Sequence, residues 1–421
     1  MSHLLDRRRT VLAGLGAWAG TAVSARAAAD PLAGASLDAD VRTYAGLGEH
    51  RTGTPGDRAT TAWLLRALRA AGYAAEAQGF DYPVFELGRA ELKLAGRTLQ
   101  SFPYWTPATT PPGGVTAPLS AAGGAGRIAL VTLAAGAGGG LNAAPPPEIV
   151  TAVASGALAV VVVTENPLGE LAALNRTPKA GAWRVPVLLA AARDGAALRA
   201  AAAAGAPLTA RLEGRTVLRR AHNVIGHRVR PGRHLVLSTP KSGWFRCAGE
   251  RGSGIAIWLG LARWLATTER HVVLLAATGH EFDGYGGRQF TETLAPKPAD
   301  TALWLHIGAN VAAYDFALAD GKIVRRPGPQ SARVLACSNG LIPAAAEAFA
   351  GQPGYAQPFD IDRTKPPGEV AHFQELGYAP LIGLVAGHPL HHTRRDLADV
   401  TGPQVLEPVA RGLAALIAAA T

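Results

Sequence analysis

Two short clusters of polar residues in the second half of the chain could carry out chemistry. His280 and Glu281 directly follow an apolar run at residues 272–277, and Asp283 and a glycine-rich turn come next. A second cluster, the histidines within residues 387–393, follows another apolar run at 380–385. Imidazoles transfer protons near neutral pH, and imidazoles and carboxylates both bind zinc. These clusters are candidates for acid–base or metal chemistry, and the alternative is a pair of solvated turns.

The apolar runs before these clusters predict strands that are buried on both faces, as in a parallel sheet covered by helices. Further strands are expected at residues 234–238 and 302–307, and helices at 254–266, 344–349 and 402–420. This alternation predicts an α/β fold with a mainly parallel, helix-covered sheet. Ligands bind such sheets beyond the carboxyl ends of the strands, which is where both polar clusters would lie.

The first half of the chain differs in composition from the second. Residues 37–80 predict a helix, a turn, a second helix and a short strand at about 73–80. Between residues 87 and 214, Pro- and Gly-rich clusters separate short apolar strands at 127–133, 158–164 and 185–190, with a helix at 148–155. Strands that alternate with short helices predict a small α/β module, which contains no cluster of catalytic residue types.

The composition restricts the class of protein. The chain has 421 residues, of which 48% are hydrophobic, so it can form a large core and is long enough for two domains. Its net charge is +10, but the arginines are scattered and no basic block with interleaved aromatics occurs, so no nucleic-acid partner is expected. Cys247 and Cys337 do not form a C-x-x-C pair, which excludes a cysteine-based zinc knuckle, and their spacing does not show whether they pair.

The N-terminus predicts a signal peptide over residues 1–29. Arg7, Arg8 and Arg9 precede a moderately apolar stretch at 11–23, and small residues follow up to Ala29. The segment resembles a twin-arginine export signal. It is too short and too rich in Gly and Ala for a membrane anchor, and no other apolar run is long enough to span a bilayer. The mature protein is therefore expected to be exported, periplasmic or secreted, without a membrane span.

Several framing motifs occur in a recognisable order. They are R-T-G-T-P-G at 51–56, H-N-V-I-G at 222–226, G-S-G at 252–254 and H-H-T-R-R-D-L-A-D at 391–399. Together they resemble the co-catalytic zinc aminopeptidase family, which includes bacterial leucyl aminopeptidase, plasma glutamate carboxypeptidase and the one-zinc glutaminyl cyclases. Within the insert, G-R-I-A-L-V at 126–131 and A-V-A-S-G-A-L-A-V-V-V-V at 152–163 resemble a protease-associated domain.

The resemblance implies a division of the chain. The signal peptide covers 1–29, the aminopeptidase-like domain 30–86 and 215–421, and the protease-associated-like insert 87–214. The family's first metal-binding histidine is missing, because residues 238–242 read S-T-P-K-S. The aspartate after a later strand is also missing, since its place falls on Gly308, with His306 nearby as a loose substitute.

Other metal ligands of the family are retained or exchanged. The bridging aspartate corresponds to Glu250, and the last histidine corresponds to His392. The family's Glu-Glu pair falls on His280 and Glu281, so the ligand is kept and the general base becomes a histidine. The resemblance thus implies one zinc ion held by Glu250, Glu281 and His392, and a site without metal is the alternative.

The leading functional hypothesis is an exported hydrolase of amide or peptide-like bonds with at most one zinc, acting on a peptide or a small molecule. His280 would shuttle the proton. One alternative is a catalytically inactive relative that binds ligands in the same cleft. Another is a metal-independent hydrolase with Ser242, or else Cys247 or Thr239, as the nucleophile and His280 as its base.

Secondary roles are expected for residues around this site. Lys241 would supply positive charge to an oxyanion, and Trp244 and Glu369 would line the substrate pocket. The alternatives are packing under a loop for Trp244 and a helix cap for Glu369. His388 and His391 are expected to be bystanders beside His392, and Asp396 to anchor the loop that carries His392.

Overall fold

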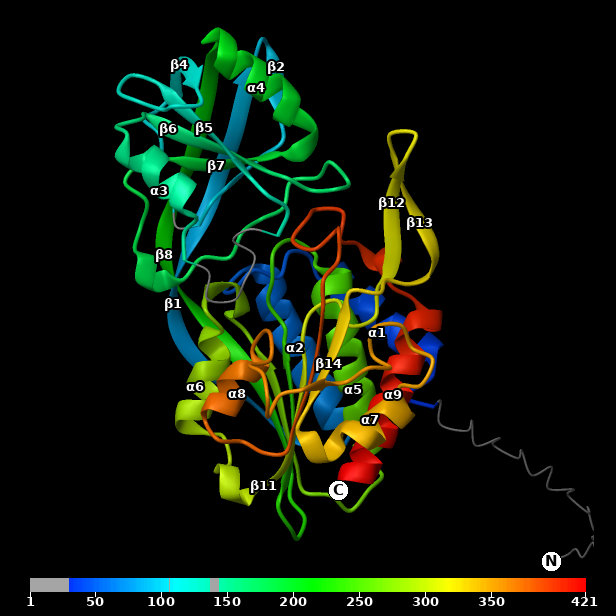
Figure 1. The fold of residues 1–421 in the computed structure, drawn as a ribbon. Helices are drawn as coiled ribbons and strands as arrows, with labels where there is room; N and C mark the ends of the chain where they lie inside the picture. Colours follow the sequence, from blue (N-terminus) through cyan, green and yellow to red (C-terminus); the bar gives the residue numbers. More distant parts are fainter. Residues whose placement is uncertain (1–29, 106, 137–143) are drawn as a thin grey trace, which may run out of the picture.

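The structure of the protein is a computed structural model, and it describes residues 30–105, 107–136 and 144–421 (Figure 1). The predicted signal peptide lies outside these ranges. The described chain forms a main α/β domain and a smaller α/β insert, which lies above the main domain in Figure 1. Among the described helices, none is long and apolar enough to cross a membrane.

The main sheet has four parallel strands at its centre. In spatial order they are β10 (Val272–Ala277), β9 (His234–Pro240), β11 (Thr301–Ile307) and β16 (Leu381–Ala386). Antiparallel strands border them, with β8 (Pro207–Arg228) beside β10 and β14 (Arg333–Cys337) beside β16. The short β15 (Phe359–Asp360) pairs with β14. The predicted mainly parallel α/β sheet is confirmed, with mixed pairing at its edges.

Helices cover both faces of this sheet (Figure 1). One face carries α1 (Gly34–Gly46), α2 (Pro55–Ala70), α5 (Ser253–Leu265), α7 (Ile342–Ala348) and α9 (Pro403–Ala420). The other face carries α6 (Tyr285–Thr293) and α8 (Val370–Glu375), whose Phe290 and Phe373 pack against Trp304 of β11. Because both faces are covered, the central strands are apolar on both sides, which explains the unbroken runs in the sequence.

Two long strands connect the main domain with the insert. β1 (Ala74–Leu94) and β8 pair antiparallel along nearly their whole length, with a bulge between Leu87 and Arg89 near Gly214. The expected short strand at 73–80 therefore continues to Leu94, because pairing with β8 extends it. The expected domain borders, 86/87 and 214/215, fall beside this bulge.

The strands of the insert continue the main sheet beyond β8, which pairs antiparallel with the first of four parallel strands. β4 (Val115–Ser120), β5 (Ile128–Leu133), β6 (Ala159–Thr164) and β7 (Val187–Ala191) are parallel neighbours, and β3 (Ser101–Pro103) pairs with β7. β2 (Arg97–Leu99) pairs with β1. The helices α3 (Pro147–Ala154) and α4 (Gly195–Ala204) pack on this sheet.

One hairpin was not expected from the sequence. It consists of β12 (Tyr314–Ala319) and β13 (Lys322–Pro329), and it projects from the main domain in Figure 1. Most of its side chains are exposed or half-buried, so it lacks the apolar alternation that marks a half-buried strand.

Candidate functional site

Four loops meet at the carboxyl ends of the parallel strands. Lys241 and Ser242 follow β9, and His280 and Glu281 follow β10. Asn310 follows β11, and His391 and His392 follow β16. The two polar clusters singled out in the sequence therefore lie at one edge of the sheet, as parallel strand order requires.

A buried carboxylate and two histidines form the first part of the site. Glu250 lies in a π-helical turn, Ala248–Gly252, directly before α5, and it is fully buried. Its Oε1 lies 3.3 Å from His392 Nε2, and its Oε2 lies 3.8 Å from His391 Nδ1. Among the described residues, these three form the cluster whose donor atoms, all within 4.8 Å of one another, could hold a metal ion.

His391 belongs to this cluster and is not a bystander. Its ring stacks on that of His392 with the centroids 3.7 Å apart. His392 has a left-handed backbone, with φ 59°, and this conformation accompanies the stacking of the two consecutive rings. The sequence does not show whether two consecutive histidines stack on the same side of the backbone, as here, or point to opposite sides.

The insert sets the proton position on His392. Its Nδ1 lies 2.9 Å from the carbonyl oxygen of Ala173. A carbonyl only accepts, so Nδ1 carries the proton and the lone pair of Nε2 is directed at Glu250. Two acceptors that face each other need a proton or a cation nearby. Burial alone would raise the pKa of Glu250, but the Arg251 guanidinium beside it holds that pKa well below its ordinary value.

Arg251 supplies that positive charge. Its side chain is fully buried, and its Nη2 lies 2.8 Å from Glu250 Oε1. Its Nε donates to the carbonyl of Ser242 at 2.9 Å. Within the described part of the chain, its Nη1 has no hydrogen-bond partner. An unpartnered buried donor beside a carboxylate is typical of a site that binds a ligand.

The zinc aminopeptidase resemblance implies zinc at this place, so the fit of the residues matters. One carboxylate and two imidazoles are suitable ligands. However, His391 Nδ1 is already 3.0 Å from Asn310 Nδ2, which donates to it. A divalent ion on Glu250 would also lie close to the Arg251 guanidinium. At about 5 Å and an effective dielectric of about 20, that repulsion is roughly 7 kcal/mol.

This repulsion weakens zinc binding, and the hydrogen bond from Asn310 already takes up the Nδ1 lone pair of His391. A structural zinc site contributes about 10–16 kcal/mol of binding free energy, so the arginine would remove roughly half of it. The residues, as they are arranged, do not fit a zinc ion.

Glu281, an expected ligand, is not a member of the cluster formed by Glu250, His391 and His392. Its Oε1 accepts hydrogen bonds from the backbone nitrogen of Thr52 at 2.7 Å and from Thr52 Oγ1 at 2.9 Å. Its Oε2 accepts from Ser242 Oγ at 2.7 Å. Two donors from the loop before α2 and one from the loop after β9 hold this carboxylate. The contact with Thr52 joins residues more than 200 positions apart, which the sequence does not indicate.

The second part of the site is a carboxylate shared by two histidines. Glu369 Oε1 lies 3.1 Å from His280 Nδ1, and Glu369 Oε2 lies 3.3 Å from His306 Nε2. Burial would raise the pKa of Glu369, but the two imidazoles lower it to about 2, so the carboxylate stays charged. Glu369 makes no side-chain cap on α8. A carboxylate on Nδ1 leaves Nε2 of a histidine available to act on a substrate or water.

His306 extends this chain of contacts into the core. Its Nδ1 lies 2.9 Å from Ser238 Oγ, which accepts a hydrogen bond from Trp304 Nε1 at 2.8 Å. The sequence singled out His306 only as a loose metal substitute. Of the groups around Glu369, His280 is the one with appreciable exposure, at 14% of its side chain. His280 is therefore placed to react, and His306 to position Glu369.

The structure places Ser242, Lys241 and Trp244 away from their expected roles. Ser242 is buried, and its hydroxyl donates to Glu281 and accepts from Gly279 N at 2.8 Å, so it does not face His280 as a nucleophile. Lys241 is fully buried in an ion pair with Asp57. Trp244 is 1% exposed and packs in an aromatic cluster, with its Nε1 donating to Asn175 Oδ1 at 2.9 Å.

Cys247 and Asp396 support the structure of the site rather than its chemistry. Cys247 is a buried free thiol, and burial raises its pKa well above the ordinary value, so it is not a reactive thiolate. Asp396 accepts from the backbone nitrogens of Gly249 at 2.6 Å and Glu250 at 2.9 Å. Asp396 thus anchors the turn that carries Glu250.

Unusual backbone conformations gather around the site. Residues other than glycine with left-handed φ are rare and cost about 1–3 kcal/mol each, so they persist where the surroundings impose them. Those near the site are Phe245, Cys247, Asp283, Asn310 and His392. Such clustering is typical of functional sites and has no signature in the residue types.

The insert closes the site from above. Asn166 Nδ2 donates to the carbonyl of Pro389 at 2.8 Å, and Ala173 N donates to the carbonyl of His392 at 2.9 Å. A cavity of about 160 Å³ remains between the insert and the histidine loop, and it is lined in part by His391 and His392. In this closed arrangement, His280 and His391 are the partly exposed side chains of the site.

Two buried histidines predict acid sensitivity. Burial lowers the pKa of His306 to about 4, and burial together with Lys241 lowers that of His50 to about 3. Between these values and 6.5 the unfolded chain binds more protons, so stability falls as the pH falls. From pH 7 to pH 5, we expect these two histidines to lower the free energy of unfolding by about 4 kcal/mol, while Asp396, whose pKa burial raises to about 7, offsets part of this drop.

Urea unfolding at the two pH values measures this drop. The variant His50→Asn should remove about half of the histidine contribution. An equal pH dependence in His50→Asn and the wild type would show that the imidazole of His50 is not buried in its neutral form.

Comparisons with known proteins are consistent with this architecture. No protein-family model and no curated protein sequence matches the chain. Among solved structures, a zinc aminopeptidase from Bacillus subtilis has 16% identity and a TM-score of 0.70, with 93% of this chain and 96% of that chain covered. A peptidase M28 precursor from Shewanella amazonensis SB2B has 14% identity and a TM-score of 0.70, with coverages of 91% and 95%.

A third structure, an aminopeptidase from Aneurinibacillus sp. strain AM-1, has 16% identity and a TM-score of 0.62, with 91% of this chain and 93% of that chain covered. Similarity over nearly the whole of each chain at such low identity establishes a common fold, and function has to be argued from the site. The resemblance found in the sequence is confirmed at this level: the protein has the fold of the zinc aminopeptidases.

Proposed function

We propose that this protein hydrolyses amide or peptide-like bonds at the carboxyl ends of the parallel strands, with a peptide or a small amide as substrate. The observation that carries the proposal is the contact of His280 with Glu369 and, through it, with His306. A partly exposed imidazole held by a buried carboxylate is an arrangement suited to general acid–base catalysis. It lies where ligands bind in this class of sheet.

The proposed mechanism uses water as the nucleophile. His280 Nε2 takes a proton from the attacking water, and the resulting imidazolium is stabilised by the charged Glu369 at Nδ1. The same nitrogen then gives the proton to the leaving amine. Arg251, buried beside Glu250, adds positive charge next to the site, which favours the negative charge that develops on the substrate. No step requires a metal ion.

The positions of the other candidate nucleophiles support this choice. Ser242 donates its proton to Glu281, and Cys247 is buried with a raised pKa. The proposal therefore favours water over an acyl-enzyme formed on either residue. A burst of product in the first turnover would contradict it.

A substrate panel tests the function. Purified protein is incubated with aminoacyl and peptidyl p-nitroanilides, dipeptides and N-acyl amino acids, with and without EDTA. Turnover that EDTA leaves unchanged is the expected result. Binding without turnover across the panel would favour the catalytically inactive alternative, and turnover that EDTA abolishes and zinc restores would show metal chemistry.

Export is part of the proposal and rests on the N-terminal sequence. The arginines at positions 7–9, the apolar stretch and the small residues after it favour translocation in the folded state. Fractionation of cells that express the full chain should place the protein outside the cytoplasm. Replacement of Arg8 and Arg9 by lysine should retain it in the cytoplasm, and equal export of this variant would contradict the twin-arginine route.

A further inference from the structure

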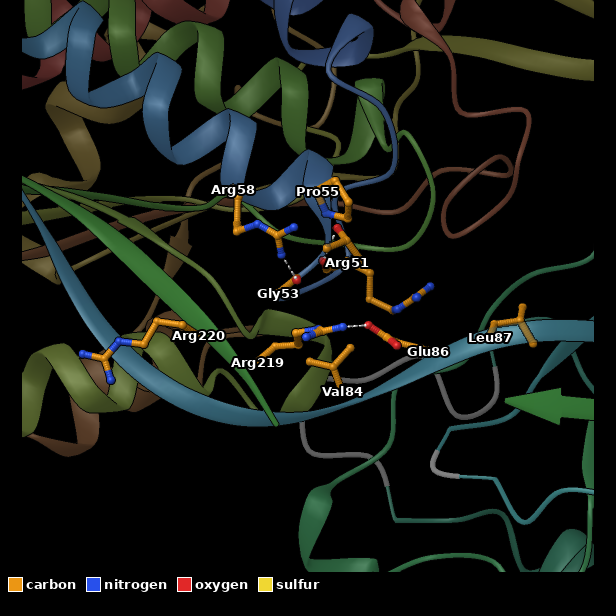
Figure 2. Close-up of a pocket in the computed structure, with 10 residues that line it drawn as sticks. Arg51, Gly53, Pro55, Arg58, Val84, Glu86, Leu87, Arg219 and Arg220 are labelled. Carbon is orange, nitrogen blue, oxygen red and sulfur yellow. Dashed lines mark hydrogen bonds and ion pairs between the residues drawn. The ribbon is translucent and has the colours of Figure 1, made fainter. Parts of the chain in front are cut away.

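A second cavity lies outside the catalytic cleft, where the loop before α2 meets β1 and β8 (Figure 2). Its volume is about 530 Å³, within the range of about 300–1,000 Å³ that is usual for small-molecule sites. Apolar side chains form part of the wall. The charged side chains of the lining are four arginines and one glutamate: Arg51, Arg58, Arg219, Arg220 and Glu86.

Arg51 is the unusual member of this set. It is only 8% exposed, and its guanidinium carbon lies 4.6 Å from the centre of the Trp105 ring. Within the described residues, its guanidinium makes neither an ion pair nor a hydrogen bond, and its Nε is buried without a partner. Burial lowers the pKa of Arg51, and the more distant carboxylates of Glu49 and Glu281 oppose this shift only in part. Buried charges in proteins are normally paired.

Two further arginines border the same space. Arg58 Nη1 donates to the carbonyl of Gly53 at 2.7 Å, and Arg219 Nε donates to Glu86 at 2.9 Å. Figure 2 shows their guanidinium groups on the two sides of Gly53. Glu86 neutralises part of the charge of Arg219, and the N-terminus of α2 at Pro55 adds positive potential. The cavity therefore carries an excess of positive charge.

We propose that this cavity binds the carboxylate or phosphate group of a small anionic ligand, with Arg51 as its principal contact. A planar guanidinium binds both groups through paired hydrogen bonds, and both would compensate the buried charge. The apolar wall of Val84, Leu87 and Pro55 would contact the carbon skeleton of the ligand. The inference does not depend on the proposed hydrolase activity, because it rests on a different cavity.

The ligand would lie next to the catalytic cleft. Arg51 precedes Thr52, whose backbone nitrogen and hydroxyl hold Glu281. An anionic group bound to Arg51 would therefore lie one residue along the chain from Thr52, which contacts the catalytic cleft through Glu281.

Isothermal titration of the full mature protein with inorganic phosphate and, separately, with succinate tests the proposal at constant ionic strength. We expect one site per chain for at least one of the two anions, and their ratio of affinities identifies the preferred group. Arg51→Gln should weaken that binding at least about 10-fold, since hydrogen bonds to a charged partner contribute about that much or more. Arg51→Lys should weaken it less.

Arg230→Gln is the matched control. Arg230 is not part of the cavity lining and pairs with Glu269 at 2.7 Å, so its removal changes the net charge without changing the cavity. Binding should change less than about 2-fold in this variant. Absence of stoichiometric binding of either anion would overturn the proposal, as would an equal loss in Arg51→Gln and Arg230→Gln. Thermal melts confirm that both variants are folded.

Discussion

Replacement of His280 by alanine is expected to lower kcat/KM of the hydrolysis about 100- to 10,000-fold. General acid–base catalysis by a positioned side chain contributes about 100- to 10,000-fold, and His280 is the partly exposed imidazole that a buried carboxylate holds. The loss should appear in kcat, because the proton is moved in the transition state and not on substrate binding. Steady-state kinetics on the best substrate of the panel measure it.

Glu369→Gln gives the second arm of this test. The amide keeps the shape of the side chain but removes the charge that stabilises the imidazolium, so kcat should fall about 10- to 100-fold and the acidic limb of the pH profile should move. A role confined to packing would change stability and leave the profile in place. His227→Gln is the matched control and should retain full activity. His227 of β8 pairs with Val273 at the start of β10, at the opposite end of the strand from His280. Full activity of His280→Ala would refute the proposed mechanism.

The second large effect is expected at Arg251. The wild-type protein should contain less than about 0.1 zinc per chain, because Arg251 already pairs with Glu250 and would repel a divalent ion. Arg251→Met removes this charge at similar length and leaves Glu250, His391 and His392 facing one another. We expect zinc affinity at least about 1000-fold higher than that of the wild type, as the repulsion of several kcal/mol is relieved. Elemental analysis and titration with zinc measure both quantities.

The stability of Arg251→Met provides an independent readout. Loss of one partner of a buried ion pair costs about 3–5 kcal/mol, so the variant should melt below the wild type without zinc. Zinc should raise its melting temperature and leave that of the wild type unchanged. Arg251→Lys keeps the charge and should remain without zinc, and adding His392→Ala to Arg251→Met should abolish the gain. Stoichiometric zinc in the wild type would refute our assignment of Arg251.

The elements of the main domain were largely predictable from the sequence. The runs at 272–277 and 380–385 are apolar at every position because helices cover both faces of the sheet, so local composition reports their burial. The polar residues directly after these runs necessarily lie at one edge of a parallel sheet. That is why His280 and His392 could be singled out without knowledge of the tertiary structure.

The partners of these residues depended on contacts between distant segments. Glu281 was expected beside Glu250, but Thr52, 229 positions away, holds it. Glu369 was expected to line a pocket or cap a helix, and the packing of α8 against β11 directs it to His280 and His306 instead. Local patterns cannot report such pairings, because they depend on where separate loops are brought together.

The sequence by itself determined the α/β class, the edge of the sheet at which chemistry can occur and the residue types available there, since these follow from periodicity and composition. Only the tertiary structure decided which carboxylate meets which histidine, that Arg251 pairs with Glu250 at the position expected for a metal, and that Arg51 remains without a partner among the described residues. The reason is that hydrogen bonding and charge compensation act over a few ångströms in space, whatever the separation along the chain.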